Sequence, residues 1–424
     1  GRGLGLPGVV LVPPYGEMTV GAALVTASHG SSLVGPASLG PYVKAAVLVD
    51  GSGQVHALDT PGDLLEGSAG LLGVVTEVTL AVGPARKVAV KQLQEEDGQL
   101  VGDLRDIIEH SEAAALDVTW SPAAGMYTAR VWHETEADMS GDARATWGHM
   151  SADWLEAANR RLLADGVARH DTGEVCALLG DLTGASHFSR EDGWSEGDQY
   201  GVSVGWANRM AGASCGRNGL DCVWRGAQYV PHALSISSED FADWVEDVRA
   251  VMATTKGCPA FTINLRFVME SDAPMAMHSG RQVVAVELAA HGGRGGTIPM
   301  RSAHLLEEIV QMSLCKYEAR PHWAHAPNRL FTSPCPLRDT LGADFDAFLE
   351  ARAQYDPASL FTTPLYDALL NRRLGPRYPG CAVAGDCWCQ EDGHCGARHK
   401  CVAGAVFTEY NVCVPESWHR NSEL

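Results

Sequence analysis

The chain has 424 residues, 46% of them hydrophobic, which is ample for a packed core and suggests roughly two or three domains. Its 52 acidic and 32 basic residues give a formal net charge of −20. This balance argues against nucleic acid or an anionic membrane as a partner, because both require clustered Lys and Arg. No apolar run reaches the ~18 residues of a membrane span. The sequence starts at Gly1 without a basic-then-apolar leader, which indicates either a leader that was removed or an incomplete N-terminus.

Short β-strands are predicted within residues 1–85, which are rich in Gly, Val, Leu and Thr. The run 43–49 is followed by a turn sequence at 50–53 and by the run 54–58, which is the pattern of a β-hairpin. β-Branched residues concentrate in 73–82 and predict a further strand.

From about residue 86 onward, apolar residues recur with helical spacing between strand-like runs. Helices are predicted at 100–108, 154–162, 241–252, 303–317 and 344–354, and strands at 88–93, 125–132, 228–236, 260–269 and 282–289. For the last helix, Asp344 is the expected N-cap and Pro357 lies beyond the end. This mixture predicts an α+β fold with an antiparallel sheet and helices on one face.

Six of the 12 cysteines lie in the last 44 residues: Cys381, Cys387, Cys389, Cys395, Cys401 and Cys413. Because this segment is loop-rich and has little apolar material, it predicts a tail with three disulfides of open connectivity. A zinc site is the alternative, although Cys387 and Cys389 form C-x-C rather than the paired C-x-x-C of many zinc modules. Disulfides imply an oxidising compartment, hence the secretory pathway or the cell exterior.

Two glycine-containing stretches have the properties of ligand-lining turns. Gly30 lets the backbone approach a ligand closely, and the neighbouring N–H groups and hydroxyls can surround a phosphate or a ring edge. The second stretch, Gly70-x-x-Gly73, leads into the strand predicted at 73–82. It lacks the strand–GxGxxG–helix context of an NAD site. A simple tight turn is the alternative for each. The residues predicted to bind a cofactor are His29, Gly30, Ser31, Ser32, Gly70, Gly73, Val74 and Val75.

Together the two stretches resemble the second half of the PCMH-type FAD-binding domain in the vanillyl-alcohol oxidase superfamily. Leu6-Pro7 and Pro13-Pro14-Tyr15 fit the approach to that half. The motif Arg320-Pro-His-Trp323 resembles that of aldonolactone oxidoreductases, as does the segment 355–361. The stretch 208–210, Cys215, Cys222, Cys258 and the cysteine-rich tail resemble plant L-gulonolactone oxidase-like proteins.

The resemblance implies four parts. Residues 1–85 would be the second half of the FAD-binding domain, and 86–318 a cap domain for the substrate. Residues 319–375 would return to the flavin site, and 376–424 would form the tail. No residues match the upstream half-domain with its pyrophosphate-binding loop, so a separate N-terminal piece is one way to complete the site.

By the same resemblance, FAD would take a hydride from a ring carbon of a sugar lactone, and oxygen or another acceptor would reoxidise it. Arg266 would be the cation that stabilises developing charge, with a strand-surface Arg as the alternative. His322 is the expected proton acceptor, with a structural His beside Trp323 as the alternative. Asn264 stands where the family has Glu, and His325 where it has Lys.

Glu287 is a candidate replacement for the missing carboxylate, against the alternative of a solvated or paired side chain. No metal is expected. The leading hypothesis is an aldonolactone oxidase or dehydrogenase with L-gulono-1,4-lactone as the default substrate. A non-catalytic extracellular scaffold is the main alternative, and a mitochondrial galactonolactone dehydrogenase relative is a weaker one.

Overall fold

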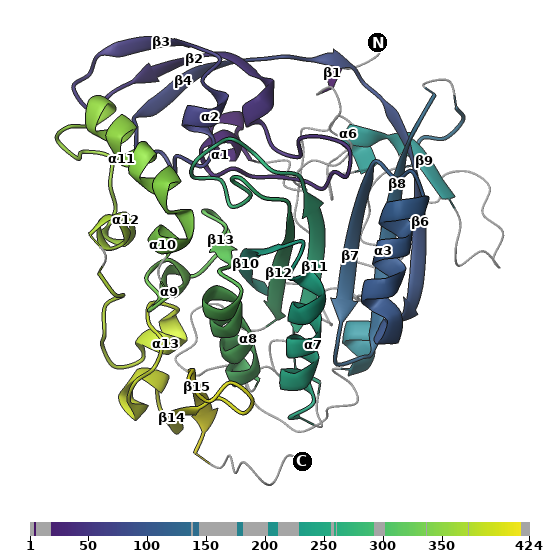
Figure 1. The fold of residues 1–424 in the computed structure, drawn as a ribbon, viewed down its shortest axis with the longest axis vertical. Coiled ribbons are helices and arrows are strands. Elements are labelled where there is room, and N and C mark those ends of the chain that lie inside the picture. Colours follow the sequence, from purple (N-terminus) through teal and green to yellow (C-terminus); the bar gives the residue numbers. More distant parts are fainter. Residues whose placement is uncertain are drawn as a thin grey trace, which may run out of the picture.

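The computed structural model describes residues 4–5, 18–136, 139–143, 176–180, 202–210, 229–255, 258–259, 261–291, 302–335, 337–371 and 373–416. The helix predicted at 154–162, the approach residues 6–15 and the cysteines at 215 and 222 lie outside these ranges. In Figure 1 a small sheet lies at one end of the molecule, a large sheet fills its middle, and the C-terminal tail lies at the opposite end.

The small sheet has the order β3-β2-β4, with strands β2 (Val43–Val49), β3 (Val55–Asp59) and β4 (Val74–Leu80). The predicted hairpin is confirmed as β2 and β3, whose antiparallel register pairs Val47 with Ala57. The Asp50 carboxylate closes its turn by accepting from the backbone N–H groups of Ser52 and Gln54. Helices α1 (Val20–Val25) and α2 (Gly62–Leu65) accompany this sheet (Figure 1).

The large sheet has eight antiparallel strands among the described residues, in the order β13-β10-β12-β11-β7-β8-β6-β9. Its strands are β6 (Lys87–Glu96), β7 (Ala115–Ser121), β8 (Met126–Thr135), β9 (Val202–Trp206), β10 (Tyr229–Ser237), β11 (Phe261–Val268), β12 (Val283–His291) and β13 (Arg320–Pro321). A short pair, β1 (Leu4–Gly5) with β5 (Gly83–Pro84), precedes it in the chain.

Three helices cover one face of the large sheet: α3 (Leu100–His110), α7 (Phe241–Met252) and α8 (Ala303–Lys316) (Figure 1). Their apolar faces pack with alternate strand residues into one core, with Trp120 and Trp244 fully buried at its centre. Burying large apolar side chains in this way contributes about 1.5–3 kcal/mol each. The predicted α+β fold, with an antiparallel sheet and helices on one face, is thereby confirmed.

A second core joins the small sheet to helices from the C-terminal third of the chain. These are α9 (Asn328–Phe331), α10 (Leu337–Leu341), α11 (Ala343–Tyr355) and α12 (Pro364–Leu370). A separate short helix, α6 (Ala207–Met210), follows β9. The prediction of Asp344 as an N-cap is wrong, because α11 begins after Gly342, which has a φ of 54°. Asp344 instead lies in the first turn, where it accepts a hydrogen bond from the Ser279 hydroxyl.

The tail consists of α13 (Cys381–Ala384) and a hairpin of β14 (His399–Ala403) and β15 (Asn411–Pro415). Its three predicted disulfides are present as Cys381–Cys387, Cys389–Cys401 and Cys395–Cys413. Two further disulfides, Cys176–Cys258 and Cys315–Cys335, lie in the rest of the described chain. Because all six tail sulfurs are bonded in pairs, they are not the thiolates that a zinc site requires.

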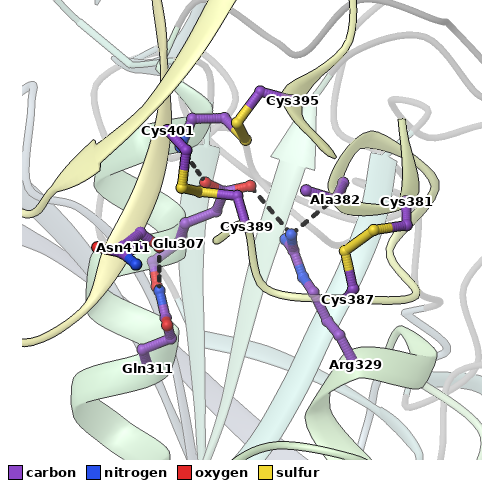
Figure 2. Close-up of polar contacts among 11 residues, drawn as sticks. Glu307, Gln311, Arg329, Cys381, Ala382, Cys387, Cys389, Cys395, Cys401 and Asn411 are labelled. Atoms are coloured by element: carbon purple, nitrogen blue, oxygen red, sulfur yellow. Dashed lines mark hydrogen bonds and ion pairs between the residues drawn. A yellow bond between two sulfur atoms is a disulfide. The ribbon is translucent and has the colours of Figure 1, made fainter. Parts of the chain in front are cut away.

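Polar side chains of α8 hold the tail against this helix. Glu307 accepts from Arg329 and from the backbone N–H of Cys413, and Figure 2 shows the Arg329 guanidinium between Glu307 and the Ala382 carbonyl. Gln311 donates to the Asn411 carbonyl (Figure 2). Burial raises the pKa of Glu307, an effect that the nearby Arg329 charge offsets. The tail is therefore held by buried polar contacts as well as by its own disulfides.

In the part of the chain that the structure describes, no helix combines the length and the apolar character that crossing a bilayer requires.

Candidate active site

The stretch 29–32, predicted to line a cofactor, lies in the loop that follows α1. The Ser31 hydroxyl is fully buried, donates to the Leu116 carbonyl and accepts from the Phe267 backbone N–H. The Ser32 backbone N–H donates to the Phe267 carbonyl. Both serines therefore attach the loop to β11 and β7, and their contact with a cofactor stays a prediction.

The residues just before the second predicted stretch contact the end of α1. The N–H of Gly67 donates to the Leu24 carbonyl, and that of Ala69 to the Val25 carbonyl at the end of α1. A Cβ on Gly73 would lie 2.4 Å from the Val49 carbonyl oxygen, so close packing against β2 demands glycine there. Gly70 has a φ of 75° and faces open space.

The two valines predicted beside Gly73 are strand residues. Val74 and Val75 pair with Val49 and Leu48 in the small sheet, and the Val74 side chain is about half exposed. Their role in cofactor binding stays a prediction.

Two polar side chains of β11 face away from the helices. Asn264 and Arg266 alternate with the fully buried Ile263 and Leu265, which pack into the core. Because side chains alternate along a strand, Asn264 and Arg266 share the opposite face of the sheet. In the antiparallel register, Asn264 pairs with Glu287 of β12, so amide and carboxylate lie side by side.

These side chains line a cavity of about 480 Å³, a volume that includes its opening to solvent. Ser28 and His29 come from the loop after α1, Ala233 and Leu234 from β10, Asn264 and Arg266 from β11, and Ala285 to Glu287 from β12. His322 and His325 follow β13, and they reach the cavity because the His322 N–H donates to the Ala233 carbonyl and the Ala233 N–H to the His325 carbonyl. All four predicted catalytic residues thus meet in one cavity.

Three imidazole rings are gathered at this cavity. The His29 and His322 ring centroids lie 5.6 Å apart, and so do those of His322 and His325. Burial lowers the pKa of His29 to about 4 and that of His322 well below 6.5. Burial also lowers the pKa of His325, which the Glu287 carboxylate partly offsets. The rings are therefore neutral near pH 7, so they can donate and accept hydrogen bonds but add no fixed charge.

Two further buried groups adjoin the cluster and were absent from the predictions. His278 lies 6.2 Å from His29 between ring centroids, and its Nε2 is 3.5 Å from a Glu66 carboxylate oxygen. Burial lowers the pKa of His278 to about 3 and raises that of Glu66 to about 7. Both residues lie in segments without strand or helix periodicity, so no pattern in the sequence indicates them.

The other members of the Arg320–Trp323 motif have structural contacts. Arg320 donates to the carbonyls of Ser279 and Thr340, and Trp323 donates to the Met275 carbonyl while stacking on Phe331. Within this motif the cavity is lined by His322. The contacts of Trp323 are therefore those of a residue that packs the site.

The residues around the cavity fit the ring end of a flavin. Arg266 makes no ion pair within the described residues, so its charge is available to a group that becomes anionic on reduction. Its register neighbour Asp117 is bound to Arg130 and Trp132 instead. The small side chains of Ala27, Ala273 and Ala276 form a separate buried cluster that includes the residue just before Ser28. The cation and the neutral imidazoles that line the cavity fit the isoalloxazine ring, whose reduced form carries negative charge.

Family models match two parts of the chain. Residues 220–369, which carry Asn264, Arg266, Glu287, His322 and His325, match the model described as D-arabinono-1,4-lactone oxidase. Residues 378–415, which form the tail, match the C-terminal domain described as L-gulonolactone oxidase 2-like.

Similar proteins include plant relatives and proteins of solved structure. L-gulonolactone oxidase 5 of Arabidopsis thaliana is 25% identical over 450 residues, covering 97% of this chain and 74% of its own length. A probable truncated L-gulonolactone oxidase 7, mitochondrial, of the same plant is 28% identical over 213 residues, covering 46% of this chain and 82% of its own. A solvent-stable cholesterol oxidase has a TM-score of 0.62 at 15% identity, covering 87% of this chain and 78% of its own, which shows a shared fold.

The matched domain contains the polar strand face, the cavity and the histidine motif described above, and the tail matches the corresponding domain of the plant relatives. Residues 220–369 are therefore similar to D-arabinono-1,4-lactone oxidases, and nearly the whole chain is similar to plant proteins named L-gulonolactone oxidase.

Proposed function

We propose that the protein oxidises a ring hydroxyl of an aldono-1,4-lactone of the L-gulono-1,4-lactone type and gives an ascorbate-type product. One observation carries this proposal: Asn264, Arg266 and Glu287 share the cavity with His322 and His325. A sugar lactone presents several hydroxyls around one carbonyl, and a cavity with a carboxylate, an amide and imidazoles can bind them in a fixed orientation. FAD supplies the hydride acceptor when it is bound.

Within this proposal each cavity residue has a distinct role. The Arg266 guanidinium stabilises negative charge that develops during hydride removal. Glu287 accepts hydrogen bonds from sugar hydroxyls, and Asn264 can donate or accept beside it. The negative charge of Glu287 raises the pKa of His325, so the two side chains interact electrostatically in the cavity. The carboxylate that the family carries on β11 is thus supplied here by the adjacent strand.

Exchanging the residues of the opposed pair Asn264 and Glu287 tests whether β12 supplies the carboxylate that the family carries on β11. Glu287→Asn is expected to raise KM for the lactone about 10- to 100-fold, because a charged hydrogen-bond acceptor is worth roughly 1.5–3 kcal/mol. Adding Asn264→Glu restores a carboxylate on the directly opposed strand position and should recover much of that loss. Steady-state kinetics of the wild type and both variants make the measurement. If Glu287→Asn alone leaves KM unchanged, Glu287 does not contact the substrate.

The electron acceptor and the location follow from the same proposal. We infer that oxygen or another oxidant accepts the electrons, and that the protein acts in the secretory pathway or outside the cell. The five disulfides of the described residues support an oxidising environment. The mitochondrial designation of one relative makes mitochondria the alternative.

An absorption spectrum of the natural protein, with its native N-terminus, tests the reaction. Near-ultraviolet and blue flavin bands are expected, and anaerobic L-gulono-1,4-lactone should bleach them, whereas the open-chain acid L-gulonate should not. Flavin bands that no aldonolactone bleaches would contradict the assignment of the substrate. A colourless protein would contradict the enzymatic proposal and favour a scaffold that retains the fold.

A further inference from the structure

The hydrogen bond of His29 fixes which of its nitrogens carries the hydrogen. Its Nδ1 lies 2.9 Å from the Gly30 carbonyl oxygen, which can only accept. Nδ1 must therefore donate. Because burial keeps this imidazole neutral, its Nε2 has no hydrogen and presents a lone pair.

His322 has the opposite arrangement. The backbone N–H of Ala324 donates to its Nδ1 at 3.1 Å, so Nδ1 carries no hydrogen. A neutral imidazole has one N–H, which in His322 must then be on Nε2. Burial together with the neighbouring His29, His325, Arg266 and His278 keeps this ring neutral.

The two rings line the same cavity with their centroids 5.6 Å apart, so the cavity wall presents an acceptor nitrogen next to a donor nitrogen. We propose that His29 and His322 bind the substrate hydroxyl that is oxidised, with His29 Nε2 accepting from its O–H and His322 Nε2–H donating to its oxygen. This inference rests on the proposed function. A hydroxyl suits such a pair because it has one hydrogen to give and two lone pairs to receive.

The pair also accounts for the proton in the oxidation. As the C–H electron pair leaves as hydride, which bound FAD would accept, the O–H bond breaks and its proton passes to His29 Nε2. The carbon–oxygen double bond forms with the remaining electron pair, and the new carbonyl oxygen keeps the hydrogen bond from His322. The role of proton acceptor that the sequence suggested for His322 therefore belongs to His29, because Ala324 already occupies the acceptor nitrogen of His322.

Nuclear magnetic resonance of the ligand-free protein labelled with ¹⁵N-histidine tests the two tautomers directly. Near pH 7, His29 should show a protonated Nδ1 and a bare Nε2, and His322 should show the reverse. This readout requires neither bound FAD nor turnover, so it separates failure of the inference from failure of the proposed function. The same tautomer in both residues, or a protonated imidazolium in either, would overturn the inference.

Two substitutions test the hydroxyl contact while keeping each local hydrogen bond. His29→Asn retains an N–H for the Gly30 carbonyl but loses the distal acceptor, and His322→Asn retains an oxygen for the Ala324 N–H but loses the distal donor. Each is expected to weaken lactone binding about tenfold, and His29→Asn should slow flavin reduction about 10²-fold or more. His110→Asn, at an exposed position of α3, is the matched control.

With C2 as the carbon that is oxidised, the 2-deoxy lactone lacks the reacting hydroxyl and completes the test. It should bind the wild type and both variants with equal affinity, because the pair has no hydroxyl to contact. A variant that loses affinity equally for the lactone and for its 2-deoxy analogue would show a general disturbance of the cavity and overturn the proposed contact.

Discussion

Arg266→Gln is expected to lower kcat/KM for the lactone by about 10²–10³-fold, because one preorganised group at a site of developing charge contributes about that much. Arg266 faces the cavity from β11 and makes no ion pair within the described residues. Among the described residues, no ion-pair partner therefore neutralises the charge of Arg266. The loss should fall on the rate of flavin reduction more than on KM, because the charge develops in the transition state.

Two further variants define the origin of that effect. Arg266→Lys keeps a positive charge and should recover part of the rate, although a compact ammonium lacks the guanidinium fork. Lys91→Gln removes a cation from an exposed position of β6 in the same sheet and should leave kcat/KM unchanged. Rapid-reaction measurements of flavin reduction make the comparison. A rate for Arg266→Gln equal to that of Lys91→Gln would exclude Arg266 from catalysis.

Glu308→Ala is expected to destabilise the protein by about 3 kcal/mol or more. The Glu308 carboxylate is fully buried and accepts the backbone N–H groups of Ala405, Val406 and Phe407 at 2.7–2.9 Å. Removing it leaves three N–H donors without their acceptor, and each unsatisfied buried donor costs about 1–3 kcal/mol. The loop 405–407 should consequently detach from α8, while the contacts of Glu307 and Gln311 keep the rest of the tail in place.

Thermal unfolding together with hydrogen exchange at residues 405–407 measures this loss. Glu308→Gln keeps one acceptor oxygen and should be less damaging than Glu308→Ala. Glu409→Gln, at an exposed position of the same loop, is the control and should leave both readouts unchanged. Exchange at 405–407 that stays slow in Glu308→Ala would mean that the loop is held by other contacts.

Periodicity in the sequence predicted most of the regular elements, because one buried face imposes a regular spacing on a helix or a strand. Helices α3, α7, α8 and α11 and strands β2, β3, β4, β6, β8, β10, β11 and β12 lie at predicted positions, with ends shifted by a few residues. Strand β7 was missed although its apolar Leu116, Val118 and Trp120 alternate with the polar Asp117, Thr119 and Ser121, and in the structure both sets are buried.

The short helices α9, α10 and α12 were missed for a different reason. Each spans only four to seven residues, so it offers too few turns for a periodic pattern. They are held by packing into the second core beside the small sheet, which is a tertiary effect.

The residue types of the site could be listed from the sequence, whereas their assignment to roles depended on the fold. Arg266, Asn264, His322 and His325 were singled out by the family motifs. That Glu287 lies directly opposite Asn264 follows from the register of β11 with β12, which the sequence does not encode locally.

The sequence by itself determined the fold class, the cysteine-rich tail and the family motifs, because these depend on residue type and on local spacing. The tertiary structure alone decided which groups meet, bringing His29 from the first fifty residues beside His322 from the last third of the chain. It also decided the tautomers, since an imidazole places its hydrogen according to the hydrogen bond that its other nitrogen makes. Such a bond depends on the position of a backbone group in space, here Gly30 for one ring and Ala324 for the other.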